Sequence, residues 1–195
     1  MVIIDGAENK DYKLCKNIND FKYSININNT PKGMEANSLT CIMNLLGVPS
    51  IYIPEGRAYL EALSIGENIE DDDLVLRCNN VDIRDEILIS SCSTDRKEIN
   101  KIGEDFKLIH IGRYKNLLII RNGYKDFESL VTYPPHQNLG ENIKKLLPKC
   151  NNKQLEIFLR DLILKFNIYP WGQSKKNILP SFYELHKLKG AVICR

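Results

Sequence analysis

The sequence lacks any apolar run that approaches the ~20 residues of a membrane-spanning helix. Its start, Met1–Gly6, lacks the basic stretch and long apolar segment that are typical of a signal peptide. A net charge of +2 leaves little excess positive charge for nucleic acid or membrane surfaces. These absences predict a cytoplasmic protein whose partners include neither nucleic acid nor membranes.

Closely spaced cysteines are also missing. No two of the six cysteines have the two-residue spacing of a zinc knuckle or a redox pair, so we expect most of them to be buried, reduced thiols. What is present is an apolar content of 43% and a charged content of 27%, which suit one or two compact units with an ordinary soluble surface.

The stretch 31–47 predicts a loop with Pro31 and Gly33, followed by a helix that ends at Gly47. Ser38 lies where the first helical turn begins. A hydroxyl there usually caps the helix by accepting a hydrogen bond from a backbone N–H. The alternative is a nucleophile, because a helix N-terminus attracts anions such as phosphate. The stretch by itself leaves both interpretations open.

Two further residues stand at the boundaries of predicted elements. Val2–Ile4 predicts a buried strand that ends at Asp5, which is a candidate metal ligand or acid, or else the first residue of an ordinary Asp-Gly turn. Arg57 comes just before a predicted helix at 58–65. Its guanidinium could bind a phosphate bidentately, or it could be a surface charge. The carboxylates at 70–73 predict a solvated turn rather than a calcium loop.

The remaining patterns predict alternating strands and helices. His136 lies in a rigid segment, 131–136, and a lone histidine is more often structural than a ligand. The segment 169–176 contains Gly172 and two lysines, and predicts a loop suited to an anion, with Lys175 in it. We expect strands at 2–4, 23–27, 74–76, 87–89, 106–111, 117–121 and 191–193, and helices at 94–103, 142–147, 153–166 and 181–188.

A series of short segments spans nearly the whole chain: Ile4-Asp5-Gly6, Gly33-Met34 to Leu45-Leu46-Gly47, Gly56-Arg57-Ala58 with Leu60-Glu61-Ala62-Leu63, Arg77-Cys78-Asn79, Tyr114 with Leu117-Leu118, Thr132 with Pro134-Pro135-His136, Leu147-Pro148-Lys149, Trp171-Gly172-Gln173 with Lys175, Leu179-Pro180-Ser181-Phe182, and Leu188 to Ile193. Their number, order and spacing resemble the archaeal-type 2,3-bisphosphoglycerate-independent phosphoglycerate mutases, which belong to the alkaline phosphatase superfamily.

The resemblance implies an α/β fold, with a partial alkaline-phosphatase-like catalytic sheet and an inserted α+β domain. Residues 1–79 would form the first segment of the catalytic domain, 80–167 the insert, and 168–195 the return to a truncated catalytic domain. The residue composition changes near Val81, which agrees with this division.

The implied chemistry is the glycolytic interconversion of 3-phosphoglycerate and 2-phosphoglycerate through a phosphoserine and two divalent metal ions of the Mn, Mg or Zn class. By resemblance the nucleophile, also a metal ligand, falls on Ser38, and the first metal-binding aspartate on Asp5. The residues expected to bind substrate are Arg57, Arg77, Lys115, His136 and Lys175.

The chain departs from the family pattern at several places. Leu39 follows Ser38 where the family has an aspartate, and Gln137 follows His136 where another aspartate is usual. The family's remaining metal-binding Asp and His residues would lie beyond Arg195. We therefore expect the chain alone to be inactive and to need a C-terminal-half partner chain, or to self-associate. The alternative is a non-catalytic relative that serves as an anion-binding or scaffold module.

Overall fold

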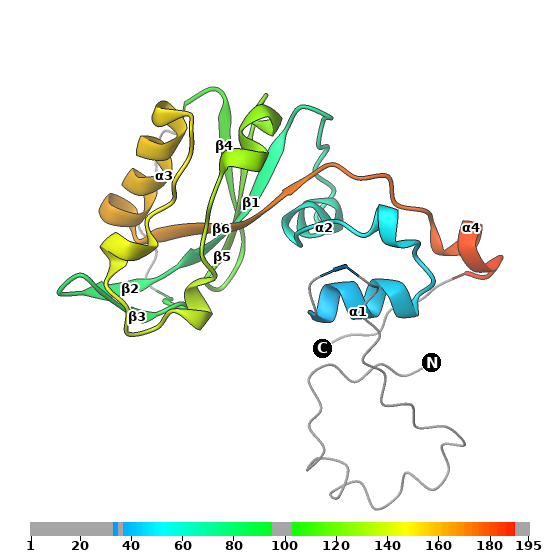
Figure 1. The fold of residues 1–195 in the computed structure, drawn as a ribbon, viewed down its shortest axis with the longest axis horizontal. Helices are drawn as coiled ribbons and strands as arrows, with labels where there is room; N and C mark the ends of the chain where they lie inside the picture. Colours follow the sequence, from blue (N-terminus) through cyan, green and yellow to red (C-terminus); the bar gives the residue numbers. More distant parts are fainter. Residues whose placement is uncertain (1–32, 35–36, 95–102, 190–195) are drawn as a thin grey trace, which may run out of the picture. The chain divides into compact units, whose positions relative to one another are not determined.

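The computed structural model describes residues 33–34, 37–94 and 103–189, and the chain divides into two compact units (Figure 1). One unit is 54–177, and the other combines 1–53 with 178–195. The predicted strands at 2–4, 23–27 and 191–193, Asp5, and most of the predicted helix at 94–103 lie outside the described residues. Across the described ranges, every helix is too short or too polar to cross a membrane.

A four-stranded antiparallel sheet forms the centre of the 54–177 unit. Its order is β4-β5-β1-β6, with β1 at Leu74–Asn80, β4 at Phe106–Gly112, β5 at Lys115–Ile120 and β6 at Ile168–Lys175. A separate hairpin pairs β2 (Asp82–Arg84) with β3 (Ile87–Ser90). The predicted mixture of helices and strands is confirmed; the alkaline-phosphatase-like sheet stays a prediction.

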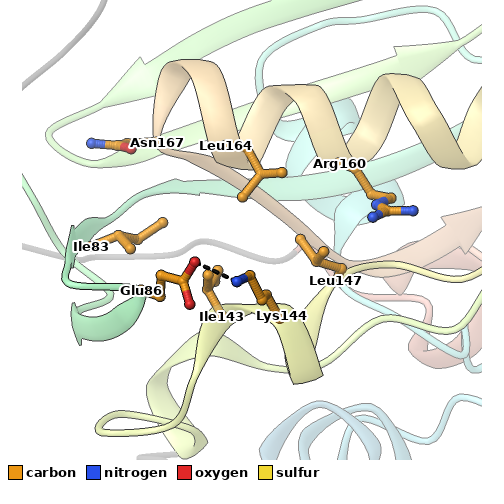
Figure 2. Close-up of a pocket in the computed structure, with 8 residues that line it drawn as sticks. All are labelled: Ile83, Glu86, Ile143, Lys144, Leu147, Arg160, Leu164 and Asn167. Atoms are coloured by element: carbon orange, nitrogen blue, oxygen red, sulfur yellow. Dashed lines mark ion pairs between the residues drawn. The ribbon is translucent and has the colours of Figure 1, made fainter.

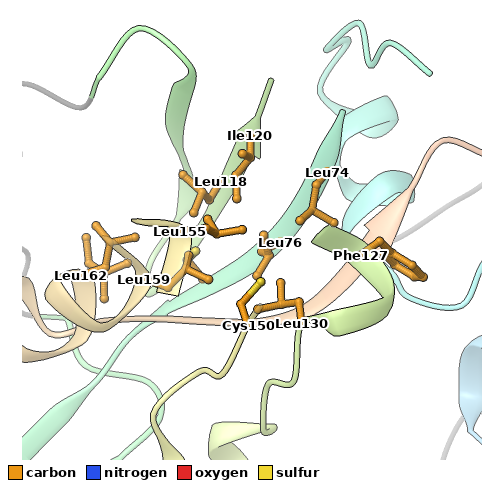
Figure 3. Packing of buried hydrophobic residues seen from close by; sticks show 12 residues of the cluster. Leu74, Leu76, Leu118, Ile120, Phe127, Leu130, Cys150, Leu155, Leu159 and Leu162 are labelled. Atoms are coloured by element: carbon orange, nitrogen blue, oxygen red, sulfur yellow. The ribbon is translucent and has the colours of Figure 1, made fainter. Parts of the chain in front are cut away.

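Helix α3 (Lys153–Phe166) covers one face of this sheet and matches its predicted range. It begins at the N-cap Asn152 and ends at Asn167, which adopts the left-handed conformation of many helix C-termini. Alternate residues of β1 and β5 pack against the helix, as Figure 3 shows, and burying these aliphatic side chains holds the two layers together. The cluster contains Leu74, Leu76, Cys78, Leu118, Ile120, Phe127, Leu130, Cys150, Leu155, Leu159, Leu162 and Ile168.

Helix α2 (Ala58–Ser64) lies on the opposite side of the sheet from α3 (Figure 1). Its Glu61 pairs with Arg77, which belongs to the β1 residues that point away from the α3 core. Three short 3-10 helices lie between β5 and α3: η4 (Tyr124–Ser129), η5 (Pro135–Gln137) and η6 (Ile143–Leu146), the last within the helix predicted at 142–147.

The second unit contains α1 (Ser38–Leu45), η3 (Ser50–Tyr52) and α4 (Phe182–His186). Ser181 caps α4 through a capping box with Glu184, and the helix lies within the predicted range 181–188. In α1 the cap is Asn37 rather than Ser38: its Oδ1 accepts a hydrogen bond from the Thr40 N–H at 2.9 Å. Of the two interpretations left open for Ser38, the helix cap is therefore wrong, and Ser38 is the first helical residue.

Segment 169–176 is the clearest correction to the sequence-based prediction, because it forms most of strand β6 rather than a loop. Gly172 and two lysines suggested a loop. The strand also contains Pro170, which is tolerated because β6 is an edge strand of the sheet. A second correction concerns Asp73, which is buried and pairs with Arg121, although the rest of its acidic run is exposed as predicted.

The sheet unites residues from all three predicted segments. It takes β1 from 1–79, β4 and β5 from 80–167, and β6 from 168–195. The three-segment division of the family fold stays a prediction. Cysteines in the described ranges are free thiols, of which Cys78 and Cys150 are buried, and burial raises the pKa of the Cys78 thiol well above its usual value.

Candidate functional site

Side chains from α2, β1, η5 and β6 form a network of contacts on the face of the sheet that α2 covers. We call Glu61, Arg77, Asn79, His136 and Trp171 the Trp171 cluster. The strand register places Arg77 of β1 directly opposite Trp171 of β6, so their side chains emerge on the same face. The sheet thus joins segments that are 94 positions apart in the sequence, as Arg77 and Trp171 are.

Arg77 is held on two sides. Its Nε donates to Glu61 Oε2 at 3.1 Å, and its Nη2 lies 3.0 Å from Glu61 Oε1. Its Cζ lies 4.4 Å from the centroid of the Trp171 ring, a cation–π contact. The two charged side chains are only 16% and 24% exposed, so water screens their attraction less than it would at an open surface.

The pairing with Glu61 leaves part of the guanidinium for other partners. A guanidinium carries five N–H groups, and Glu61 engages one on Nε and one on Nη2. The edge formed by Nη1 and Nη2 is therefore not the edge that Glu61 holds. Arg77 can keep its ion pair with Glu61 and still present a second edge, whose N–H groups match the spacing of two carboxylate or phosphate oxygens.

Trp171 is itself fixed in place. Its Nε1–H donates to Asn79 Oδ1 at 3.0 Å, and Asn79 in turn donates from Nδ2 to the Ser91 carbonyl at 2.8 Å. Asn79 is buried, so these two bonds satisfy polar atoms that water cannot reach. The exposed His136 ring stands edge-on to Trp171, with centroids 5.2 Å apart. The cluster therefore has a rigid base and one exposed imidazole.

A bulge in β6 lies directly beside the cluster. The pairs Val75–Ser174 and Arg77–Trp171 leave one more residue on β6 than on β1, and Gly172 in that interval has φ +60°. Thr132 Oγ1 accepts the Gly172 N–H at 3.2 Å and donates to Gln173 Oε1 at 2.7 Å. These bonds anchor the bulge and fix the direction of the preceding Trp171.

Arg57 precedes α2 and is exposed. Its neighbour Gly56 packs tightly on the bulge, because a Cβ at that position would lie 2.5 Å from the Gln173 carbonyl oxygen. This close approach fixes the start of α2 against β6. The helix then places Glu61, one turn after Arg57, beside Arg77.

Lys115 lies at the start of β5, opposite Asn79 in the sheet, and is exposed. Its Nζ lies 5.9 Å from the ring centroid of Tyr114, and the Arg77 charge also acts on Tyr114. A hydrogen bond with Cys92, and secondarily burial, raise the pKa of the Tyr114 hydroxyl, while Arg77 acts in the opposite direction. Lys115 and Tyr114 thus border the Trp171 cluster.

Lys175 lies apart from the cluster, at the other end of β6. Its Nζ is 4.7 Å from the Phe127 centroid and 5.3 Å from that of Tyr124, with Glu128 Oε1 at 3.8 Å. Of the residues expected to bind substrate, the structure brings Arg77 and His136 to one ring. Lys115 lies opposite Asn79 in the sheet, and Arg57 directly precedes α2. Lys175 lies apart from these residues, because it is the last residue of β6 whereas Trp171 lies in the middle of that strand.

The expected nucleophile and metal ligands belong to the other unit or lie outside the described residues. Ser38 stands at the start of α1, and Asp5 is not among the described residues. Within 33–34, 37–94 and 103–189, three or more His, Cys, Asp or Glu side chains do not come together as a metal site would require. A serine and an aspartate alone do not supply the six or so oxygen ligands that ions of the Mg class take. The described residues do not fit two divalent ions.

Sequence patterns alone did not reveal the roles of Glu61 and Asn79. Glu61 lies in the first turn of a short helix, where a carboxylate ordinarily interacts with the helix dipole. Asn79 looked like a polar residue at a strand end. The predicted strand at 74–76 ended before Arg77, whereas the structure places Arg77 inside β1 among buried residues, where a half-buried guanidinium requires a carboxylate partner.

Comparisons with known proteins agree on one family. A family model described as 2,3-bisphosphoglycerate-independent phosphoglycerate mutase matches residues 26–167. A similar curated protein, 2,3-bisphosphoglycerate-independent phosphoglycerate mutase 2 of Methanothermobacter thermautotrophicus, is 26% identical over 194 residues, covering 84% of this chain and 47% of the relative. A Methanosarcina barkeri protein with the name 2,3-bisphosphoglycerate-independent phosphoglycerate mutase is 29% identical over 197 residues, covering 84% of this chain and 48% of the relative.

Among solved structures, the cofactor-independent phosphoglycerate mutase from Thermoplasma acidophilum matches with a TM-score of 0.48 and 18% identity, covering 75% of this chain and 49% of that one. The chain spans about half the length of the curated relatives it matches.

Proposed function

Since the chain belongs to the family of 2,3-bisphosphoglycerate-independent phosphoglycerate mutases, we propose that it supplies the substrate-binding portion of an enzyme that interconverts 3-phosphoglycerate and 2-phosphoglycerate. The observation that supports this most directly is the Trp171 cluster. Four of the segments that carry the family resemblance meet there, and they surround a guanidinium with an edge that Glu61 does not hold.

In this proposal Arg77 binds the substrate's carboxylate or phosphate through its Nη1–Nη2 edge. Phosphoglycerate carries both groups, and each offers paired oxygens that match the spacing of a guanidinium edge. His136 supplies a ring N–H at the exposed rim, and Lys115 and Arg57 add positive charge nearby. Lys175 stands farther along β6 and would act through its charge alone.

Ser38 is the proposed nucleophile. The phosphoryl group would pass from the 3-oxygen of glycerate to Ser38 Oγ and then to the 2-oxygen, with one P–O bond formed and one broken in each step. The position of Ser38 at the start of α1 favours an anion, since the helix dipole gives this end a partial positive charge. Asp5 is the proposed first metal ligand, and because the described residues do not fit two divalent ions, no step is assigned to metal here.

A calorimetric titration with 3-phosphoglycerate tests the substrate-binding role. We expect heat from wild type and loss of binding in Arg77→Met. Arg84→Met is the matched control, because Arg84 is an exposed arginine that pairs only locally with Asp82 in the β2–β3 hairpin. Equal affinity of wild type and Arg77→Met would contradict the assignment of Arg77.

A coupled assay for 2-phosphoglycerate tests the catalytic role, with the chain alone and with the complementary half of a relative such as the Methanosarcina barkeri protein. Turnover that depends on both halves and disappears in Ser38→Ala supports the mutase. The second candidate, a non-catalytic anion-binding module, is favoured by Leu39, which replaces the family's aspartate beside Ser38. Binding of 3-phosphoglycerate without turnover under any of these conditions would select that candidate.

A further inference from the structure

Two adjoining cavities lie along α3, away from the Trp171 cluster. One has a volume of about 470 Å³ and the other about 410 Å³. They share the lining residues Lys144, Leu147 and Arg160, so they adjoin, and we call the two together the α3 groove. The first cavity is lined by Ile83, Glu86, Ile143, Lys144, Leu147, Arg160, Leu164 and Asn167, and the second adds Ser129, Pro148, Lys149, Cys150, Asn151, Lys153 and Glu156.

Three elements build the first cavity, as Figure 2 shows. The β2–β3 turn contributes Glu86, the η6 segment contributes Lys144, and α3 contributes Arg160 and Leu164. Leu164 is 52% exposed, so the helix presents an aliphatic surface to solvent inside this depression. The floor is apolar, and charged side chains stand around it.

The rim carries four cations and two carboxylates, a net positive charge, and Glu156 already pairs with Lys153 at 3.2 Å and Arg160 at 3.7 Å. Lys144 is 67% exposed, Lys153 74% and Arg160 44%. Glu86 Oε1 lies 2.5 Å from Lys144 Nζ, and this pairing lowers the pKa of Glu86. Glu86 therefore shows that the rim accepts a carboxylate, and a partner's carboxylate would compete for the same ammonium.

We propose that the α3 groove binds an extended acidic peptide segment of a partner protein. An extended chain projects its side chains alternately, so apolar residues can reach the floor while glutamates or aspartates reach the rim. Asn167 lines the first cavity and Asn151 the second, and a carboxamide offers both donors and acceptors to a peptide backbone. The linings run along α3 from Lys153 to Asn167, a rise of about 20 Å, which about six extended residues would span.

The lining disfavours other anions. Among the described residues no aromatic side chain lines either cavity, whereas sites for single-stranded nucleic acid stack bases on aromatic rings. A small, highly polar anion such as phosphoglycerate would leave the aliphatic floor uncovered. The groove is separate from the cluster proposed to bind phosphoglycerate, so the peptide role does not depend on that assignment.

Fluorescence anisotropy with a labelled eight-residue peptide of alternating glutamate and leucine tests the proposal on the full chain. We expect saturable binding that weakens about tenfold in K144E/R160E and tightens about threefold in Glu86→Gln, because the latter removes the competing carboxylate. Lys165→Glu is the matched control: Lys165 lies on α3 outside both linings, so its charge reversal should change affinity less than twofold.

Two comparisons decide against the proposal. If the corresponding lysine–leucine peptide or an oligothymidylate of equal charge binds as tightly as the acidic peptide, the groove does not select acidic peptide. If K144E/R160E binds the acidic peptide as tightly as wild type, the peptide binds elsewhere. Circular dichroism confirms that each variant is folded, and the Glu86→Gln gain is a readout that misfolding would not produce.

Discussion

A double-mutant cycle on Glu61 and Arg77 is the most direct test of how the Trp171 cluster is built. The two groups form a bidentate pair at 3.0 and 3.1 Å with only 16% and 24% exposure. A hydrogen bond to a charged group contributes roughly 1.5–3 kcal/mol to the free energy of unfolding. Because both side chains retain some solvent, we expect a coupling free energy of about 1.5 kcal/mol between Glu61→Gln and Arg77→Met.

Urea unfolding provides the assay, since Trp171 is the only tryptophan and reports on the cluster itself. Each single variant should lose about 2 kcal/mol of unfolding free energy, which shifts the midpoint by roughly 1 M urea. The double variant should lose much less than the sum of the two. A coupling below about 0.3 kcal/mol would show that Glu61 and Arg77 act independently, and our account of the cluster would be wrong.

The same variants separate two roles for Glu61. If Glu61 positions Arg77, Glu61→Gln should weaken 3-phosphoglycerate binding, by about tenfold for a misdirected bidentate contact. If Glu61 instead occupies the position of the ligand's carboxylate, Glu61→Gln should tighten binding. We expect weakening, because Glu61 holds the Nε–Nη2 edge and leaves the other edge to a ligand.

Two further predictions concern packing and pH. Gly56→Ala should lower the unfolding free energy by about 2 kcal/mol, and the melting temperature with it, because the new Cβ would lie 2.5 Å from the Gln173 carbonyl oxygen. Gly103→Ala is the control and should cost less than about 1 kcal/mol, because its Cβ would lie 3.6 Å from the Phe106 ring. Equal losses in the two variants would contradict the close approach of Gly56. Glu156 accepts the Cys150 N–H, which holds its pKa below the ordinary 4.5, so its stabilising contribution is present at neutral pH and is lost as pH falls through the lowered pKa of the folded state. Chemical unfolding between pH 6 and 3 should show that Glu156→Gln flattens this acid-side decline, and an unchanged pH profile would remove Glu156 as a cause.

How much of the fold the sequence predicts depends on how local each signal is. The helix at 153–166 was correctly bounded, because its apolar stripe, Asn cap and C-terminal Asn all lie within one continuous segment. The strands at 74–76 and 117–121 were found for the same reason, since a buried strand is a short apolar run. Local patterns therefore located the core.

Strand β6 was missed because its identity is decided by partners far away in the sequence. Pro170 and Gly172 normally interrupt a strand, and two following lysines suggested an exposed loop. The edge position of β6 and its bulge accommodate both residues, but neither the edge nor the bulge is visible until β1 is known to be the neighbour. Long-range pairing overrode local propensity here.

The candidate site follows the same logic. Arg77 and His136 were identified as binding residues by resemblance alone, and nothing in their spacing shows that both contact one ring. What the structure adds is a cause for their placement: Trp171 is fixed by Asn79, and the bulge at Gly172 directs it toward Arg77. Burying half of an arginine side chain lowers stability unless its charge is paired, and Glu61 supplies that pairing for Arg77. Because one guanidinium edge suffices for that pair, neutralising the charge and binding an anion are compatible tasks for Arg77.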